Sequence, residues 1–273
     1  MNISRGQCKH VGDGIGPLTR AFVNFSTSKP VFPISPPIDY SSEGLSENKI
    51  ASWAIVLFSV VAYMGATFAG LLLTMVPLLI IGVGEGAALS IGFLLTQIVV
   101  IPMILLFVYL DGSIARTRDM LRFGSPKRAA MMILGIPTIA LIVDNILVFI
   151  YAVIFVLFFG EPGTNTDIGT TWESSNLAIL LTFISICIMT PISEELFFRG
   201  YLLDSINRMH GQWPAILISA VIFGLVHLDP FTIGMATIGG IIYGWIRIRT
   251  GSLLPGIAAH AMWNTMALVV TYL

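Results

Sequence analysis

Long apolar stretches with few or no charges alternate with short polar segments from about residue 50 to the end of the chain. A bilayer core of about 30 Å is crossed by about 20 apolar residues in helical form, so each stretch of that length is a candidate membrane span. The pattern therefore predicts an all-α fold, a polytopic transmembrane helical bundle of about seven spans. The predicted spans are 51–75, 87–110, 129–159, 177–203, 213–228, 231–246 and 253–273.

The composition of the chain indicates the same class of protein. Of its 273 residues, 56% are hydrophobic and 11% are charged, whereas a typical soluble domain is about 25% charged. A water-soluble globule is therefore excluded, and the lipid bilayer of the cell membrane is the expected partner of this multi-pass protein. The formal net charge of −1 excludes a surface that binds nucleic acid, because such a surface needs a concentrated basic stripe.

Basic residues are confined to alternate segments between the predicted spans. All 14 Lys and Arg residues fall on one side of the predicted threading, within 5–49, 116–128, 199–208 and 247–249. Because short cytoplasmic loops are enriched in Lys and Arg, the N-terminus is expected in the cytoplasm and the C-terminus outside. The polar segment 1–49, which contains four prolines between residues 30 and 37, is expected to be a cytoplasmic, largely disordered tail.

Several ionisable side chains lie inside the predicted spans, where each costs about 2.5–3.5 kcal/mol on insertion scales and therefore needs a partner or a function. Asp144 is expected either to cap a break near Pro137 or to bond a neighbouring helix. The others form three short motifs with polar or aromatic neighbours. These motifs contain Glu194, Glu195 and Arg199, then Phe223 and His227, then His260 and Asn264.

The spacing inside the first motif predicts its local geometry. Glu195 and Arg199 are four residues apart and should form an ion pair on one helical face, which leaves Glu194 rotated by about 100° onto another face. The two glutamates should therefore have different roles. Pro191 cannot donate a backbone hydrogen bond, so it is expected to kink the helix just before Glu194 and to make room for water.

Residue counts along the predicted hairpins bring the three motifs together. At 1.5 Å per residue, Glu194 and His227 each lie roughly 20 Å from the turn near residues 207–212, and His260 also lies inside the membrane. A carboxylate and two imidazoles at similar depth, with the amide of Asn264 beside one imidazole, predict a hydrolytic site.

The three motifs resemble those of the CPBP family of intramembrane proteases, formerly called Abi, which includes type 2 CAAX prenyl endoproteases and bacteriocin-processing or immunity proteins. The family patterns EExxxR, FxxxH and HxxxN match residues 194–199, 223–227 and 260–264, within a similar region of roughly 177–273. The resemblance implies hydrolysis, inside the membrane, of a peptide bond in a membrane-associated or lipidated peptide or protein.

The resemblance also implies roles for the matched residues. By it, Glu194 would be the general base that activates water, and His227 would help to position or share the proton. His260 and Asn264 would stabilise the oxyanion. Glu195, Arg199 and Phe223 would provide structural support.

The use of a metal stays open at this point. No HExxH pattern occurs among the four histidines, which excludes a zincin helix. Glu194, His227 and His260 would still supply a His₂Glu ligand set for Zn²⁺ with an open position. Catalysis by Glu194 without a cofactor is the favoured expectation.

Two other classes of function fit the same residues. In a non-catalytic immunity factor or membrane scaffold, the motifs would serve only as hydrogen bonds between helices. In a proton-coupled transporter, Asp144, Glu194 and His227 would form a proton relay, but the sequence shows no internal repeat of the kind many transporters have. With the protease interpretation, the organisation is a tail (1–49), three N-terminal spans (50–176) and the catalytic helices (177–273).

Overall fold

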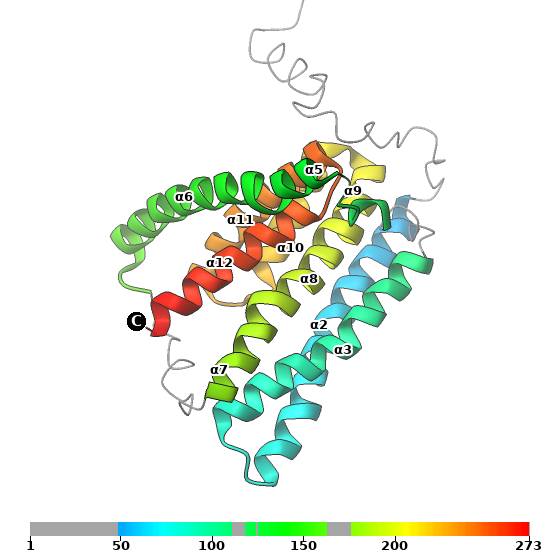
Figure 1. Ribbon diagram of the computed structural model, residues 1–273. Helices are drawn as coiled ribbons and strands as arrows, with labels where there is room; N and C mark the ends of the chain where they lie inside the picture. Colours follow the sequence, from blue (N-terminus) through cyan, green and yellow to red (C-terminus); the bar gives the residue numbers. More distant parts are fainter. Residues whose placement is uncertain (1–48, 111–117, 124, 163–175, 273) are drawn as a thin grey trace, which may run out of the picture.

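A computed structural model describes residues 49–110, 118–123, 125–162 and 176–272, and these residues form helices and no strand (Figure 1). The all-α class predicted from the sequence is confirmed. The predicted tail, apart from Lys49, lies outside the described residues. The α-helices are α2 (Lys49–Ile80), α3 (Glu85–Leu110), α5 (Pro126–Ala130), α6 (Ile136–Phe159), α7 (Asn176–Thr182), α8 (Thr190–Glu195), α9 (Leu203–His210), α10 (Gln212–Leu225), α11 (Pro230–Thr250) and α12 (Leu254–Tyr272).

Two of the long helical stretches contain π-helical turns. The segment η1 (Met131–Gly135) joins α5 to α6, whereas η3 (Phe183–Met189) and η4 (Leu196–Leu202) lie on either side of α8. One uninterrupted helical rod therefore runs from the start of α7 to the end of α9. This rod contains the first motif.

Among the described residues, five helical stretches are long and apolar enough to cross a membrane, so the chain is a membrane protein. They are Trp53–Ile80, Glu85–Leu110, Pro126–Phe159, Ile179–His210 and Pro230–Thr250. The stretches Gln212–Leu225 and Leu254–Val270 are apolar but shorter. The count of seven spans and the orientation of the termini therefore stay predictions.

The predicted span 213–228 is wrong at its end. The helix α10 stops at Leu225 and has 14 residues, which is about 21 Å of helix and less than a bilayer core of about 30 Å. Hydrophobicity continues past Leu225, and for this reason the pattern of the sequence did not reveal the turn.

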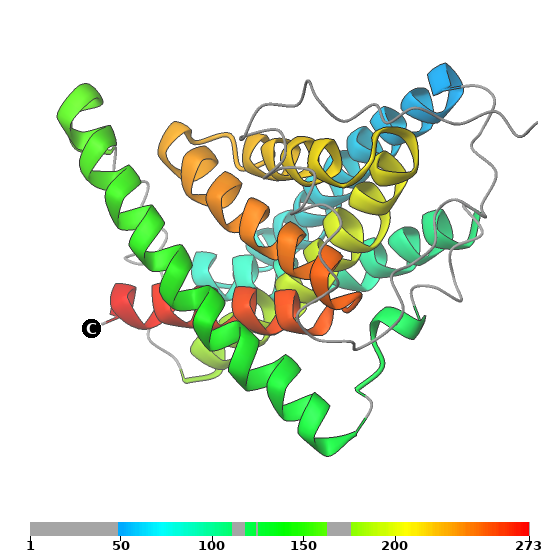
Figure 2. The ribbon, with the colours of Figure 1, turned by 90° about the horizontal axis from the view of Figure 1, so that it is seen from above.

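The rod α7–α9 lies at the centre of the bundle. The antiparallel hairpin of α2 and α3 packs along one side of it, and the hairpin of α10 and α11 packs with α12 on the other side (Figure 1). The helix α6 crosses over α12 and also contacts α11 (Figure 2). The rod is therefore enclosed by helices from both halves of the chain.

The main hydrophobic core centres on η4, where Phe197 and Phe198 are fully buried. Tyr63 of α2 stacks on Phe197, with ring centroids 4.3 Å apart. Phe223 of α10 meets Phe198 edge-on at 4.9 Å. Aromatic packing of this kind adds to the stabilisation that comes from burial alone, so η4 joins the N-terminal hairpin firmly to α10.

The outward-facing side chains of α2 and α6 are apolar as well. Leu73 is 75% exposed and Phe149 is 69% exposed. Large apolar side chains in such numbers on the outside are expected where lipid, and not water, surrounds a helix. This agrees with the membrane assignment of both helices.

The ends of helices that carry basic residues gather at one end of the bundle. The start of α2, α5, the end of α9 and the end of α11 all lie toward the upper end in Figure 1. The threading predicted from the placement of Lys and Arg also puts all these residues on one side of the membrane. Which side of the membrane this end faces stays a prediction.

Candidate active site

The first motif begins on α8, which carries Glu194 and Glu195, and continues into η4, which carries Arg199. Pro191 is in the first turn of α8, directly after η3. Because proline lacks the backbone N–H that would bond to the carbonyl four residues before it, a regular α-helix is disturbed at this point. The expected irregularity takes the form of π-helical winding, which is frequent at functional sites.

The predicted ion pair between Glu195 and Arg199 is confirmed. Nη1 of Arg199 lies 3.0 Å from Oε1 of Glu195, and the two side chains are 1% and 0% exposed. The guanidinium also lies over the ring of Phe223, 4.2 Å from its centroid. A buried charge pair needs such additional partners to offset the loss of water.

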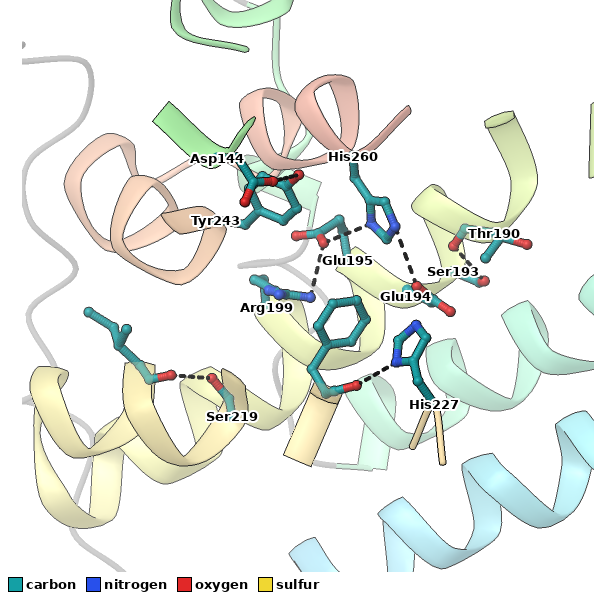
Figure 3. A network of polar contacts seen from close by, with 12 residues as sticks. Asp144, Thr190, Ser193, Glu194, Glu195, Arg199, Ser219, His227, Tyr243 and His260 are labelled. Atoms are coloured by element: carbon teal, nitrogen blue, oxygen red, sulfur yellow. Dashed lines mark hydrogen bonds and ion pairs between the residues drawn. The ribbon is translucent and has the colours of Figure 1, made fainter. Parts of the chain in front are cut away.

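His260 lies between the two glutamates (Figure 3). Its Nδ1 is 3.3 Å from Oε1 of Glu195, and its Nε2 is 3.6 Å from Oε2 of Glu194. Sequence reasoning missed this arrangement, because it assigned Glu195 to Arg199 alone. Oε1 of Glu195 in fact contacts both Arg199 and His260, so this carboxylate orients the imidazole.

The two glutamates differ in their exposure. The side chain of Glu194 is 16% exposed, whereas that of Glu195 is completely buried. The prediction that they lie on different helical faces is therefore confirmed. Glu194 is the more exposed of the two carboxylates.

Phe223 lies between the charged groups of the site. Its ring contacts His227 edge-on at 5.1 Å between centroids and His260 edge-on at 5.9 Å. With the guanidinium of Arg199 over its face, this one ring touches three of the predicted residues. It fixes the positions of both imidazoles relative to the ion pair.

His227 is not inside a helix, in contrast to the prediction. It lies in the turn after α10, where its backbone N–H donates to the carbonyl of Gly224. Its Nδ1 is 2.9 Å from the carbonyl oxygen of Phe223, which only accepts, so Nδ1 carries a hydrogen and the neutral ring leaves Nε2 as an acceptor. The next residue, Leu228, has a positive φ of 64°, which is a strained conformation for a side chain of this size.

Asn264 of α12 forms a hydrogen bond to the rod α7–α9. Its Nδ2 donates to the carbonyl oxygen of Ile186 in η3, at 2.9 Å. The contact ties α12 to the π-helical segment. A side-chain amide has two N–H groups, so the second one stays available to a ligand.

A cavity of about 200 Å³ connects these residues, and its walls include Phe223, His227, His260 and Asn264. Asp144 of α6 and Tyr243 of α11 also line it. The hydroxyl of Tyr243 donates to Oδ2 of Asp144 at 3.0 Å, which confirms that Asp144 bonds a neighbouring helix and does not cap a break near Pro137. Tyr243 was missed because a tyrosine in an apolar helix carries no signal in the sequence.

The close approach of α12 to Glu195 depends on Gly256. A Cβ atom at this position would lie 2.9 Å from Oε2 of Glu195. No such distance is found between real atoms of these types, so only glycine lets α12 bring His260 to the carboxylate. This glycine belongs to the site although it carries no chemistry of its own.

The residues do not form a ready ligand set for a metal. Within the described part of the chain, no three His, Cys, Asp or Glu side chains lie close enough together to hold a metal ion. Glu194 and His260 contact each other, but His227 is held by the carbonyl of Phe223.

Comparison with known proteins identifies the C-terminal third of the chain. Residues 176–266 match the family model described as type II CAAX prenyl endopeptidase Rce1-like. The match begins at α7, ends inside α12 and includes all three motifs. The resemblance to membrane proteases of this family, drawn from the motifs, is therefore confirmed.

Two curated proteins are similar to about a third of the chain. The "Putative membrane peptidase YdiL" of Bacillus subtilis (strain 168) is 33% identical over 93 residues, which are 34% of this chain and 38% of that protein. The "Uncharacterized 24.3 kDa protein" of Escherichia coli is 29% identical over 96 residues, which are 33% of this chain and 44% of that protein. The similarity thus spans less than half the length of either relative. No solved structure matches the chain.

Proposed function

We propose that the protein is an intramembrane endopeptidase that hydrolyses a peptide bond in a membrane-associated or lipidated peptide or protein, with a water molecule activated by Glu194. One observation carries the proposal. His260 lies between Glu194 and Glu195 at the wall of a cavity that His227 and Asn264 also line. The Rce1-like match and the name of the Bacillus relative support the same class of activity.

A charge count around His260 defines the resting state. Glu195 beside Arg199 is ionised and accepts the hydrogen on Nδ1 of His260. Nε2 then faces a carboxylate oxygen of Glu194, and two acceptors cannot face each other at 3.6 Å unless a proton or a water molecule lies between them. With an imidazolium at His260, the positive charges of His260 and Arg199 balance the negative charges of the two glutamates, as a site away from water requires.

The first chemical step uses the accessible carboxylate. Glu194 takes a proton from water while the water oxygen forms a bond to the carbonyl carbon of the peptide. Nε2 of His227 is an acceptor and helps to hold the same water molecule, since Nδ1 is occupied by the carbonyl of Phe223. General-base catalysis of this kind contributes about 10²–10⁴ in rate.

The oxyanion that forms needs hydrogen-bond donors. The Nε2–H of the His260 imidazolium and the second N–H of Asn264 line the cavity and supply them. The tetrahedral intermediate then collapses, and the C–N bond breaks. Glu194 delivers its proton to the leaving amine, which restores the carboxylate.

The test is cleavage of quenched fluorescent peptides, with and without a lipid anchor, by the protein purified in lipid nanodiscs. Glu194→Gln keeps size and polarity but removes the base, so we expect a loss of about 10²–10⁴ in kcat/KM. Glu161→Gln is the matched control, because Glu161 is exposed and lies after α6, away from the cavity. Cleavage by Glu194→Gln at the wild-type rate would contradict the mechanism, and a folded wild type without activity on any peptide would contradict the function.

A further inference from the structure

Asp144 has features that the hydrolytic mechanism does not use. It lies on α6, outside the segment 176–266 that matches the family model, and it is 2% exposed. It nevertheless lines the same cavity as His227 and His260. An ionisable group at the centre of a helix long enough to cross a membrane needs a specific reason.

Only one of its two carboxylate oxygens is bonded. Oδ2 accepts the hydroxyl of Tyr243 at 3.0 Å, whereas Oδ1 is buried and has no hydrogen-bond partner among the described residues. A residue that served only to tie α6 to α11 would not need the second oxygen. A buried acceptor without a donor is costly, so Oδ1 is suited to a donor that arrives with a ligand.

A glycine of α11 lies against the carboxylate of Asp144 and leaves space beside it. Gly239 of α11 faces the carboxylate, and a Cβ atom there would lie 3.3 Å from Oδ2 and 3.7 Å from Oδ1. Tyr243 stacks on His260, with ring centroids 5.8 Å apart, and so places Asp144 one ring away from the catalytic imidazole (Figure 3).

In the described part of the chain, the cavity wall carries one carboxylate and no basic side chain of lysine or arginine. Asp144 is the only acidic residue among the described residues that line it. A cationic group on the ligand would neutralise this carboxylate and would supply the donor that Oδ1 lacks.

We propose that Asp144 selects the peptide substrate by binding a basic side chain, of lysine or arginine, that enters the cavity near the scissile bond. The cavity of about 200 Å³ is large enough, since a buried cavity of about 150 Å³ accommodates benzene. Tyr243 holds the carboxylate in place for this contact. The inference rests on the proposed peptidase function and adds the substrate class to it.

The decisive experiment compares peptides that differ at one position, with arginine, citrulline, lysine or norleucine there. Arginine and citrulline have almost the same shape and similar N–H donors, so their difference isolates the charge. We expect the wild type to cleave the arginine and lysine peptides with a kcat/KM at least about tenfold above that of the neutral ones. In Asp144→Asn the ratio of arginine to citrulline should fall to about one, while cleavage of the citrulline peptide is retained.

Asp229→Asn is the matched control for this ratio. Asp229 caps α11 by accepting hydrogen bonds from the N–H and the hydroxyl of Thr232, and Thr232 lines the cavity. Asparagine also caps helices well, so this variant removes a nearby negative charge and keeps the local structure. It should keep the wild-type preference for arginine.

A binding measurement separates the failure of this inference from the failure of the proposed function. Labelled arginine and citrulline peptides are titrated against Glu194→Gln, which does not cleave, with and without Asp144→Asn, and fluorescence anisotropy is recorded. An affinity for arginine at least about tenfold higher, lost with Asp144→Asn, supports the inference even if no peptide is hydrolysed. Equal affinity or equal kcat/KM for the arginine and citrulline peptides in the protein with Asp144 intact would overturn the inference about Asp144. If the wild type still cleaves these peptides, the proposed peptidase function is not affected by that result.

Discussion

Two buried ion pairs occupy different regions of this bundle and have much the same local geometry. Arg199 and Glu195 lie 3.0 Å apart within one helical rod, whereas Arg247 of α11 and Asp204 of α9 lie 3.1 Å apart across two helices. All four side chains are at most 2% exposed. Burial and pairing alone therefore do not distinguish a catalytic region from a structural one.

The difference lies in the third partner of each pair. Glu195 also contacts Nδ1 of His260, which lines the cavity. Arg247 is also within 3.0 Å of the sulfur of Met120, and neither Arg247 nor Asp204 lines the cavity. The first pair holds an imidazole that faces a ligand site, and the second holds two helices together.

The largest expected effect comes from breaking either pair. Glu195→Gln and Asp204→Asn each leave a buried arginine without its counter-charge, which should lower the free energy of unfolding by about 3–5 kcal/mol. Unfolding by SDS in mixed micelles measures the loss. Asp119→Asn is the control, because its pair with Arg122 is exposed and should contribute less than about 1 kcal/mol.

Activity then separates the two pairs. Glu195→Gln also releases His260, and a misplacement of about 1 Å in a catalytic group costs about 100-fold in rate. We expect that loss per folded molecule for Glu195→Gln and near-normal activity per folded molecule for Asp204→Asn. Equal specific activities of the two variants would show that the contact between Glu195 and His260 has no catalytic role.

A smaller effect is expected from Gly256→Ala, which tests the region of Glu195 without changing any charge. The added methyl group would lie 2.9 Å from Oε2 of Glu195, so α12 must shift, and overpacking of this kind costs about 1–3 kcal/mol. SDS unfolding and peptide cleavage should both show a loss. The control is Gly65→Ala in α2, because no atom lies within 4 Å of the new Cβ at that position. This variant should leave stability and cleavage unchanged. A loss equal to that of Gly256→Ala would refute the contact between Gly256 and Glu195.

The smallest effect is expected at Asp229, a carboxylate outside the membrane spans. Hydrogen bonds from the side chain and backbone of Thr232 hold the pKa of Asp229 below its ordinary value. Asp229→Ala should lower stability by about 1 kcal/mol at neutral pH, because α11 loses its N-cap. Thermal unfolding of the purified protein measures this change.

The pH dependence of this cap has a definite sign. A carboxyl group with a lowered pKa in the folded state contributes its stability above the unfolded pKa, which is about 3.9, and the contribution is lost as pH falls through the folded pKa. The difference between wild type and Asp229→Ala should therefore shrink in acid. The difference between Asp229→Asn and Asp229→Ala should not change with pH, because neither side chain titrates, and a wild-type difference from Asp229→Ala that stayed constant in acid would contradict the assignment.

Local features of the site were predictable from the sequence. The spacing of four residues predicted the ion pair of Glu195 with Arg199, and the offset of one residue predicted a separate face for Glu194. Both follow from the pitch of a helix, which depends only on neighbours in the chain. The insertion cost of a charge likewise predicted that Asp144 has a specific partner, and a bond to a neighbouring helix was one of its two expected roles.

Contacts between helices were not predictable in the same way. The sequence contains His260, Glu194 and Glu195 but does not specify that one imidazole lies between both carboxylates. That depends on the rotation of α12 about its axis and on its close approach at Gly256. Apolar helices in lipid carry little periodicity that would specify such rotation, because side chains facing lipid and side chains facing protein are both apolar.

The sequence by itself thus determined an all-helical membrane protein and its family resemblance, and it singled out the residues that we propose carry the chemistry. Only the tertiary structure decided that α10 stops at Leu225, that His227 lies in the following turn, and that Asp144 and Tyr243 join the same cavity. The physical reason is that motifs and hydrophobicity act over a few residues or over one span. The position of a cavity depends on how several rigid helices pack at one depth, which no single segment of the chain encodes.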